Sequence, residues 1–252
     1  MLFTISIKNK LVYRFDVFFS IVGSVLYIAL NIMLWRYLYR DDPHMVDYMT
    51  AYTILSSIIS MVYARDIAGK IGGKISTGDY VVNLLRPKNF FFMEWQVSLA
   101  EITVSLILRG IPIILVFLPT LHANIAYDNL ALALVALALG HILYLLMYSL
   151  IGFSAFILIE IWPINRLVND TSRLLAGSFI PLSIMPGFLQ DIAKVLPFRF
   201  LYSFPLELLL GSFDNRNLLQ NYGILLIWIC VFAALDVAMY SIAKYKAVVQ
   251  GG

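Results

Sequence analysis

Hydrophobic and polar positions follow one another along this chain in long blocks. Six apolar blocks, at residues 17–38, 47–64, 95–118, 129–159, 167–185 and 219–243, are separated by shorter polar stretches. A bilayer core about 30 Å thick needs about 20 apolar residues per helix. The pattern therefore predicts an all-α membrane protein with six transmembrane helices, organised as a single domain over residues 1–252.

The blocks differ in character. The second carries Thr50, Thr53 and Ser56, and small hydroxyl residues favour contact with other helices. The fourth is too long for one straight span, so either it tilts and continues beyond the lipid, or it ends near Gly152 and an interfacial piece follows. The fifth is the weakest. Residues 186–218 are too apolar for a loop and too broken by prolines for a span, which indicates re-entrant or interfacial helices.

The chain begins with an amphipathic pattern over residues 1–16. Phe3, Ile7, Leu11 and Phe15 recur every four residues, with basic residues between them. This spacing predicts a helix lying at the membrane surface. The alternative is an ordinary positively charged flank of the first span. Because the apolar run that follows is long and lacks a small-residue cleavage pattern, we expect it to be retained as a span rather than removed as a signal peptide.

The longest polar interruption in the first half covers residues 65–88. Ile67, Ile71 and Ile75 form one apolar stripe at helical spacing, which needs an apolar surface from lipid or from a partner. Asp66 and Lys70 stand in the favourable i, i+4 order. We interpret the segment as a folded element that receives force from a soluble partner. The alternative is a hairpin whose basic residues touch anionic lipid headgroups.

Turn signals divide this segment into two parts. Gly72 and Gly73 weaken the first helix, by about 1 kcal/mol each, yet allow a close backbone approach. Gly78 is suited to end that helix. A second short turn is expected over residues 80–85, and Pro87 stops it, since the residue before a proline disfavours helical backbone.

The distribution of lysine and arginine predicts the orientation in the membrane. With six spans, twelve of these residues fall on one side and five on the other, with Arg109 set aside as intramembrane. Lysine and arginine are enriched in cytoplasmic loops. Both termini and residues 65–88 are therefore expected in the cytoplasm, and residues 186–218 outside. The first set is Lys8, Lys10, Arg14, Arg65, Lys70, Lys74, Arg86, Lys88, Arg166, Arg173, Lys244 and Lys246.

Composition and motifs exclude most enzymatic functions. The chain is 61% hydrophobic and only 13% charged, which leaves no room for a soluble catalytic domain. No phosphate-binding loop of the GxxxxGK[ST] type occurs, and no histidine or cysteine cluster has metal-ligand spacing. We expect no catalytic, metal or cofactor site in this chain and no nucleic-acid partner. An intramembrane hydrolase is poorly supported, because Gly152-Phe153-Ser154-Ala155 falls short of a nucleophile elbow.

Polar residues inside the apolar blocks are candidates for the transport pathway or for helix packing, because intramembrane charges are costly and usually face an interior. Glu101 and Arg109 lie about two turns apart on nearly one face. The alternative for this pair is an interfacial Glu101 and a snorkelling or structurally paired Arg109. His141 is expected to be a buried hydrogen-bonding group. The full set is Asn31, Glu101, Arg109, His141 and Asp236.

Several short motifs, together with the order in which they occur, resemble those of the ABC-2 family of ABC transporter permeases. Members of this family share a fold with exporters of the G subfamily. The motifs are Arg65-Asp66-Ile67, Lys70-Ile71, Gly78-Asp79-Tyr80, Leu85-Arg86-Pro87, Gly177, Ile180-Pro181-Leu182, Pro186, Leu196-Pro197-Phe198, Pro205 and Gly211. The resemblance covers essentially the whole chain and is greatest to a bacterial subgroup.

The resemblance implies an exporter permease in a cell membrane, such as a bacterial inner membrane, moving an amphipathic drug, peptide or lipid-like substrate out of the cytoplasm. Residues 1–16 would be a connecting helix, residues 65–88 would hold the coupling helix, and residues 186–218 the outward re-entrant region. The implied partners are ABC ATPase subunits, which bind ATP and Mg, and a second permease, the same or paralogous, within membrane lipid. The implied coupling residues are Arg65, Asp66, Ile67, Lys70, Ile71, Gly73, Lys74, Gly78, Asp79 and Arg86.

Two other functional classes remain open from the sequence. An ion-coupled secondary transporter or channel subunit would show inverted repeats with broken helices in matching positions, and residues 1–125 and 126–252 show no such match. A purely structural membrane scaffold is the other. Copurification of this chain with an ATP-hydrolysing subunit would distinguish the exporter from both alternatives.

Overall fold

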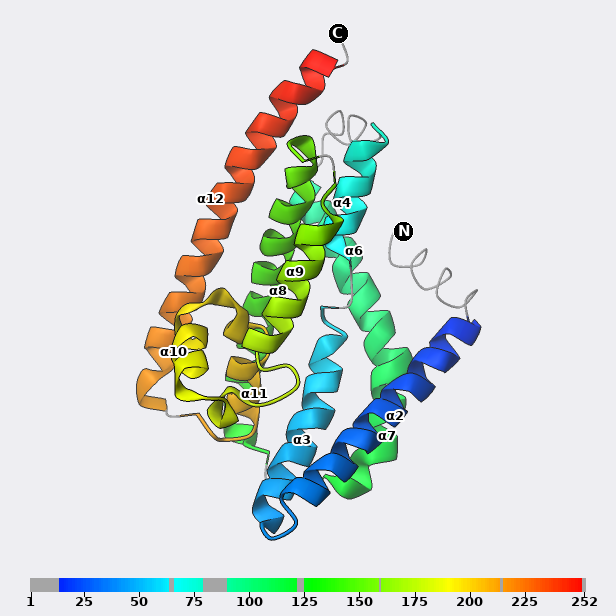
Figure 1. Cartoon of the computed structure of the whole chain (residues 1–252), viewed down its shortest axis with the longest axis vertical. Helices are drawn as coiled ribbons and strands as arrows, with labels where there is room; N and C mark the ends of the chain where they lie inside the picture. The colour runs from blue at the N-terminus through cyan, green and yellow to red at the C-terminus, as the bar shows by residue number, and fades with distance from the viewer. Residues whose placement is uncertain are drawn as a thin grey trace. The chain divides into compact units, whose positions relative to one another are not determined.

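The computed structural model describes residues 14–63, 66–78, 90–121, 125–158, 160–213 and 215–250, and within these ranges every regular element is helical. The predicted surface helix over residues 1–16 lies largely outside them. The main helices, drawn in Figure 1, are α2 (Arg14–Leu38), α3 (Pro43–Ser60), α4 (Ile67–Ser76), α6 (Phe90–Ser105), α7 (Ile111–Phe117), α8 (Leu130–Phe153), α9 (Trp162–Leu175), α10 (Gly187–Val195), α11 (Ser203–Leu209) and α12 (Leu218–Gln250).

The described residues form two compact units. The first comprises α2, α3, most of α6, α7 and α11, and the second comprises α4, most of α8, α9, α10 and α12. In the first unit, a buried apolar cluster joins three helices and is made of Ile28, Ile32, Ile54, Met61, Ile113 and Phe117. Trp35 Nε1 of α2 donates to Thr53 Oγ1 of α3 at 2.9 Å. Thr50, Thr53 and Ser56 are buried, which confirms that the hydroxyl residues of α3 face other helices.

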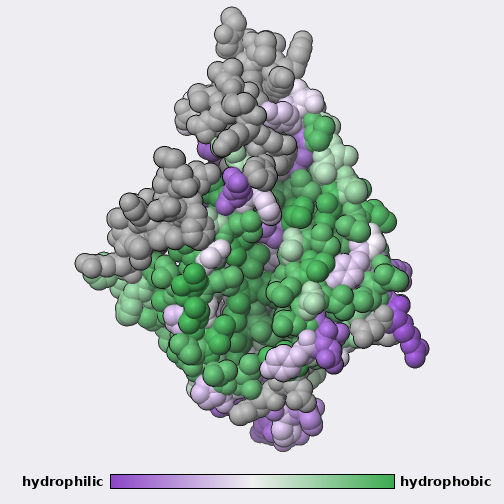
Figure 2. Space-filling model, turned by 180° about the vertical axis from the view of Figure 1, so that it is seen from behind, coloured by the Kyte–Doolittle hydropathy of each residue, from purple (hydrophilic) through white to green (hydrophobic). Residues whose placement is uncertain are grey.

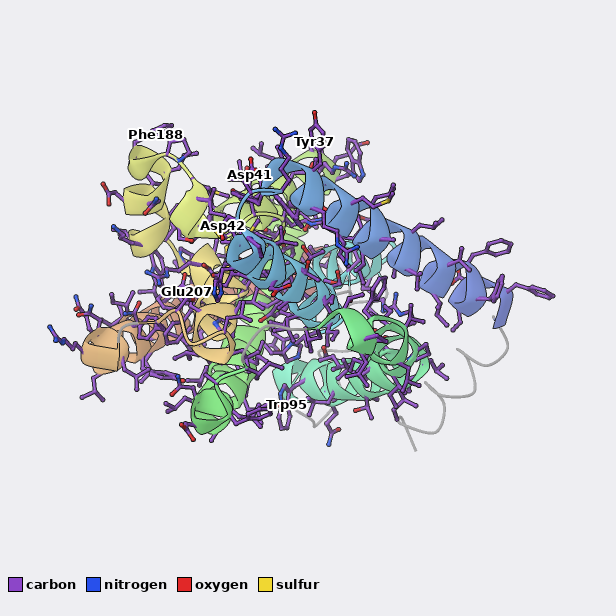
Figure 3. All side chains as sticks on the ribbon, turned by 90° about the horizontal axis from the view of Figure 1, so that it is seen from below. Tyr37, Asp41, Asp42, Trp95, Phe188 and Glu207 are labelled. Carbon is purple, nitrogen blue, oxygen red and sulfur yellow. The ribbon has the colours of Figure 1, made fainter. Side chains whose placement is uncertain are left out.

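The turn between α2 and α3 is short and polar. Figure 3 shows Asp41 and Asp42 in this turn and Tyr37 pointing away from α3. Asp42 caps α3, since its Oδ1 accepts from the Met45 backbone N–H at 3.1 Å. Pro43 follows in the first turn, where a missing N–H is tolerated. The start of α3 is therefore fixed by local sequence.

A π-helical turn, Leu106–Gly110, separates α6 from α7. Such turns insert an extra residue into a helix and often occur at functional sites. The turn contains Arg109 and contacts α2. The sequence pattern indicated one uninterrupted span here and gave no sign of this insertion.

In the second unit, α4 packs on α9 and on the 3-10 turn Ser154–Phe156 that ends α8. Helix α12 is joined to α8 through Ser149 Oγ, which donates to Asp236 Oδ2 at 2.8 Å. It is joined to the end of α10 through Trp228 Nε1, which donates to the Val195 carbonyl at 2.9 Å. Side chains of all five helices thus contribute to one packed body.

Among the described residues, four helices are long and apolar enough to cross a membrane by length and composition, namely Phe15–Leu38, Trp95–Thr120, Tyr127–Phe156 and Leu218–Ser241. They match the first, third, fourth and sixth predicted blocks. Hydrophobic residues dominate the face seen in Figure 2. Phe19, Leu30 and Met33 of α2 are among the exposed apolar side chains, as expected for a surface solvated by lipid. A six-span topology stays a prediction.

The expectation of one helix over residues 167–185 is wrong. Helix α9 begins earlier, at Trp162, and ends at Leu175. Gly177 then adopts φ +75°, a left-handed conformation that glycine reaches without strain and that turns the chain. Arg166 and Arg173, which the charge count placed on the cytoplasmic side, therefore lie on a helix. The pattern failed because α9 is amphipathic rather than continuously apolar.

The proline-rich region consists of short helices and turns. Prolines stand just before or within the first turn of three of them, α10 (after Pro186), the 3-10 turn Pro197–Phe200 and α11 (with Pro205 as its third residue). Phe188 projects outward from α10 in Figure 3, and Ala193 on the opposite side is buried. The predicted broken helices are present between residues 186 and 218, and their placement on the outer side stays a prediction.

Candidate functional site

Helix α4 begins at a well-formed N-cap. Asp66 precedes its first residue, and Asp66 Oδ1 accepts from the Gly69 backbone N–H at 2.9 Å. Asn165 Nδ2 of α9 donates to the same oxygen at 3.3 Å. The carboxylate also suits the positive end of the helix dipole. One side chain thus starts α4 and ties it to α9.

The apolar stripe of α4 is buried inside its own chain. Ile67 and Ile71 are only 1% and 2% exposed, and Ile75 is half-buried. The backbone of Gly152, at the end of α8, comes so close that a Cβ there would lie 2.6 Å from Ile71 Cβ. Gly152 is therefore required for close packing of α4 on the end of α8.

A second glycine serves the same contact from the other side. A Cβ added to Gly72 would overlap Ile161, just before α9, and lie 3.7 Å from Ala155 Cβ. The two glycines let α4 settle onto the end of α8 and the start of α9. The stripe was expected to face lipid or a partner's groove, and for Ile67 and Ile71 the structure shows that the chain itself covers it.

The opposite face of α4 is exposed. Asp66, Lys70, Gly73 and Thr77 are spaced by four, three and four residues, so they share one side of the helix, which we call the outer face of α4. Gly73 has no atom within 4 Å of where its Cβ would stand. Lys74 is half-buried beside this face. The outer face is the part of α4 that the described residues leave exposed.

The end of α4 follows the predicted pattern. Thr77 N–H donates to the Gly73 carbonyl at 3.0 Å, and Gly78 follows with φ +79°. A glycine in this conformation is the common way to terminate a helix. The prediction for Gly78 is confirmed, and α4 runs unbroken through Gly72 and Gly73. Of the other predicted coupling positions, Arg65, Asp79 and Arg86 lie outside the described residues, as does the second turn at residues 80–85.

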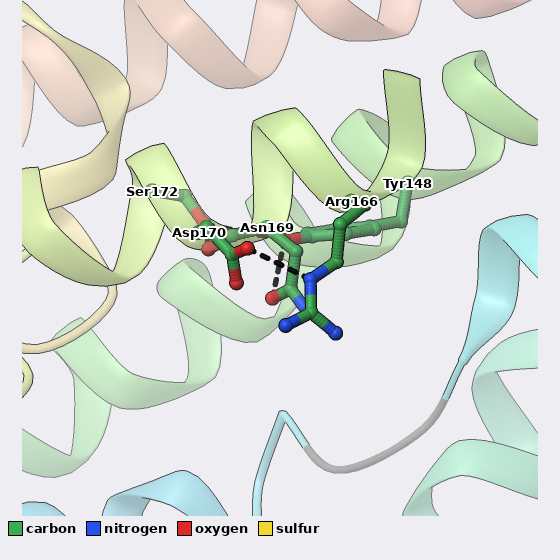
Figure 4. Close-up of polar contacts among 5 residues, drawn as sticks. All are labelled: Tyr148, Arg166, Asn169, Asp170 and Ser172. Atoms are coloured by element: carbon green, nitrogen blue, oxygen red, sulfur yellow. Dashed lines mark hydrogen bonds and ion pairs between the residues drawn. The ribbon is translucent and has the colours of Figure 1, made fainter. Parts of the chain in front are cut away.

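Helix α9 presents a polar side to its neighbours (Figure 4). Tyr148 Oη of α8 donates to Asn169 Oδ1 at 3.3 Å and lies 3.2 Å from Ser172 Oγ. With Asn165 at the Asp66 cap, these residues recur at i, i+4 and i+7 on one side of α9. Sequence reasoning missed them, although the spacing of Asn165, Asn169 and Ser172 within residues 162–175 was the available signal.

Two predicted intramembrane polar residues are satisfied within the first unit. Asn31 Nδ2 donates to the Tyr27 carbonyl one turn earlier on its own helix, at 2.8 Å. Arg109 Nη1 donates to Ser20 Oγ of α2 at 3.0 Å. The π-helical turn places Arg109 against α2. Both contacts favour helix packing over a pathway role, and Glu101 is half-buried on α6.

The remaining predicted intramembrane polar residues, His141 and Asp236, lie on α8 and α12 of the second unit. His141 is buried and its ring stacks with Tyr144, with centroids 6.4 Å apart. Asp236 is 1% exposed, with Oδ2 bonded to Ser149 and Oδ1 without a hydrogen-bond partner among the described atoms. The Asp236–Ser149 bond joins α12 to α8, whereas the His141–Tyr144 contact lies within α8. They do not meet the outer face of α4.

The described residues hold no group of three or more His, Cys, Asp or Glu side chains that could bind a metal ion. Their main feature is helix α4, which has one face packed on α8 and α9 and one face exposed among the described residues. A comparison with curated proteins finds no match. A comparison with protein families matches residues 21–250 to the family described as ABC-2 family transporter protein. The chain therefore belongs to the ABC-2 family of transporter proteins, multi-pass membrane permeases that are transmembrane subunits of ABC transporters.

Proposed function

We propose that this chain is the permease subunit of an ATP-driven exporter and that α4 is its coupling helix. Two permeases, the same or paralogous, pair with two ATPase subunits, which bind ATP and Mg. The substrate, an amphipathic drug, peptide or lipid-like molecule, leaves the cytoplasm between the permeases. Family membership supports the ATPase partnership in general.

The observation that carries the coupling role is the two-sided construction of α4. A coupling helix must be held firmly by the permease and must also present a surface to the ATPase. Ile67 and Ile71 provide the hold, because they are buried against the ends of α8 and α9. The outer face, with Asp66, Lys70 and Gly73, provides the surface. Lipid contact alone would place the apolar stripe outward, which is opposite to what is found.

The packing of α4 defines a route for force. Closure of the ATPases on ATP would push on the outer face. Since Gly152 and Ile71 are in close contact, the displacement passes to the end of α8. The Asp66–Asn165 hydrogen bond passes it to the start of α9. Packed interiors transmit such shifts because they do not deform continuously.

The topology we propose has six membrane crossings in a cell membrane, with α3 and the segment of residues 162–185, which begins with α9, added to the four long apolar helices. Because Arg166 and Arg173 lie on α9, they no longer belong to a cytosolic loop. Without these two, ten lysine and arginine residues remain on the predicted cytoplasmic side and five on the other, so the predicted orientation is unchanged. Both termini and α4 then face the cytoplasm, and α10 and α11 form the outward re-entrant region.

The experiment is copurification of the tagged permease with ABC ATPase subunits that are coexpressed from the same genome. Gly73→Trp places a large side chain on the outer face, where no atom of the described residues lies within 4 Å of the new Cβ. We expect the variant to insert normally but to retain at least tenfold less ATPase. Gly187→Trp, at an equally open glycine that begins α10, is the matched control and should retain wild-type amounts.

The ATP requirement is tested with an ATPase variant that binds but does not hydrolyse ATP. In proteoliposomes it should abolish export while leaving the complex assembled. Normal copurification and normal stimulated hydrolysis with Gly73→Trp would disprove the coupling assignment. Export that continues in the hydrolysis-deficient complex would disprove the ATP-driven mechanism.

A further inference from the structure

Helix α9 has three distinct sides. Asn165, Asn169 and Ser172 face α4 and α8. A second side is apolar and exposed, with Ile164, Leu167 and Leu174. Between them runs a third side, made of Arg166, Asp170 and Arg173 at i, i+4 and i+7, which we call the charged edge of α9. All three charged residues are exposed on this chain, and Arg166 and Asp170 retain 66% and 55% of their side-chain surface.

Contacts with α8 indicate how deep this edge lies. Tyr148, which bonds to Asn169 and Ser172, stands eight residues before the end of the candidate span Tyr127–Phe156, or about 12 Å along the helix axis. That span of 30 residues is about 45 Å long and extends about 7 Å beyond each side of a 30 Å hydrocarbon core when centred. Tyr148 thus lies about 5 Å inside the core.

The direction of α9 places Arg173 at this depth or deeper. Asn165 contacts Asp66 beside the end of α8, and Ser172 contacts Tyr148 further back along α8, so the two helices run antiparallel. Arg173 follows Ser172 directly. Arginine at such a depth is costly against lipid tails and is found facing a protein interior or a water-filled path. The charged edge therefore faces away from lipid in the working transporter.

Charge pairing on the edge leaves one arginine for a ligand. Arg166 Nε and Asp170 Oδ2 form an ion pair at 2.8 Å (Figure 4). Arg173 has no carboxylate within 4 Å among the described residues, and its guanidinium lies 4.8 Å from the centre of the Phe179 ring. Leu174, Phe179 and Ile180 around it are exposed. A cation therefore stands beside an aromatic ring and an apolar surface.

We propose that Arg173 binds the acidic group of the transported substrate and that the substrate is a single-chain anionic amphiphile. Its phosphate or carboxylate would pair with the guanidinium, which matches planar anions through two N–H donors. Its apolar part would lie on Phe179, Leu174 and Ile180. This assignment rests on the proposed export function, which it narrows to one class of substrate.

The test is equilibrium binding to the permease alone in phosphatidylcholine nanodiscs, with empty discs as background. The probes are radiolabelled dodecyl phosphate and dodecyltrimethylammonium, which share a tail and differ in charge. Arg173→Gln should weaken binding of the phosphate about tenfold or more, the usual effect of losing a charge-assisted hydrogen bond. Arg173→Lys should restore part of it. Arg40→Gln, at an exposed arginine in the α2–α3 turn, is the control and should change nothing.

The neighbouring carboxylate supplies a second, opposite change. Asp170→Asn raises the net charge of the edge by one, so it should tighten binding of the phosphate several-fold and weaken binding of the cation. It also keeps the shape of the side chain, so it reports on charge even if Arg173→Gln folds poorly. Equal affinity of all variants for dodecyl phosphate would overturn the proposal.

Two further outcomes would also overturn it. Loss of permease dimers in Arg173→Gln with unchanged probe binding would make Arg173 an interface residue. Abolition of probe binding by phosphatidylglycerol in the discs would make the site one for bulk lipid. Because no ATPase is present in this assay, its failure leaves ATP-driven export standing, and failure of ATP-driven export leaves the binding result standing.

Discussion

The contact between Gly152 and Ile71 offers a direct test of how α4 is held. In Gly152→Ala the new Cβ would stand 2.6 Å from Ile71 Cβ and 3.2 Å from the Ala68 carbonyl oxygen. Carbon atoms prefer separations of 3.5–4.0 Å, so α4 must retreat by about 1 Å. The atoms that clash belong to the stem of a side chain and to the backbone, and a rotamer change cannot relieve them.

The expected cost follows from the burial of the stripe. A gap of about 1 Å forfeits a quarter to a half of the contact energy of the atoms that line it. Ile67 and Ile71 are almost fully buried, and each such side chain contributes about 1.5–3 kcal/mol. We therefore expect the packing of α4 on α8 and α9 to become weaker by about 1–3 kcal/mol. The helix propensity gained by alanine, about 1 kcal/mol, stabilises α8 and does not restore this contact.

Hydrogen–deuterium exchange of the α4 backbone amides is the assay. A loss of 1–3 kcal/mol should speed their exchange about 5- to 150-fold when local opening controls the rate. Gly223→Ala is the matched control, because it makes the same change inside α12, where nothing lies within 4 Å of the new Cβ. It should leave α4 unchanged. Unaltered or increased protection of α4 in Gly152→Ala would refute the packing that we describe.

Three other changes test individual contacts. Asp66→Ala removes the N-cap and should destabilise α4 by about 1 kcal/mol, whereas Asp66→Asn, which retains the acceptor, should cost a few tenths, both measured by the same exchange experiment. Thr53→Val and Trp35→Phe each lower the free energy of unfolding, and their combined effect should differ from the sum of the two by about 0.6–1.7 kcal/mol in reversible unfolding from mixed micelles. Strict additivity would show that the 2.9 Å hydrogen bond between the two side chains contributes nothing. Asp236→Ala should cost about 2–4 kcal/mol in that assay, because it leaves a cavity and removes the bond to Ser149. Asp236→Asn keeps the size of the side chain and an acceptor for Ser149, so it should stay within about 1 kcal/mol. Equal losses would show that the carboxyl group itself, which both variants lack, is what stabilises this position.

The hydropathy pattern located the long helices well because an apolar span must satisfy its backbone internally and therefore be helical. The bounds expected for residues 17–38 and 219–243 lie close to those of α2 and the apolar part of α12. Local signals were equally informative at α4, where Asp66 begins the helix and Gly78 follows its end. Both cases depend on residues near in sequence.

Features that depend on distant residues were missed. The π-helical turn at Leu106–Gly110 has no local signature, and it places Arg109 against Ser20, 89 positions away. The amphipathic helix α9 was divided between a loop and a span, because its polar side is covered by Tyr148 and Asp66 rather than by water. A polar residue buried by a tertiary contact has the same sequence signature as one in a loop.

The opposite faces of α4 show where sequence ends and tertiary structure begins. The sequence by itself determined that residues 67–76 form a helix with an apolar stripe, because the spacing of isoleucines, the aspartate cap and the terminal glycine all act locally. Which surface would cover the stripe was decided only by the fold, since it required Gly152 and Ile161, far along the chain, to meet α4 without side-chain interference. Burial of that stripe by the chain itself leaves the opposite face of α4 exposed among the described residues.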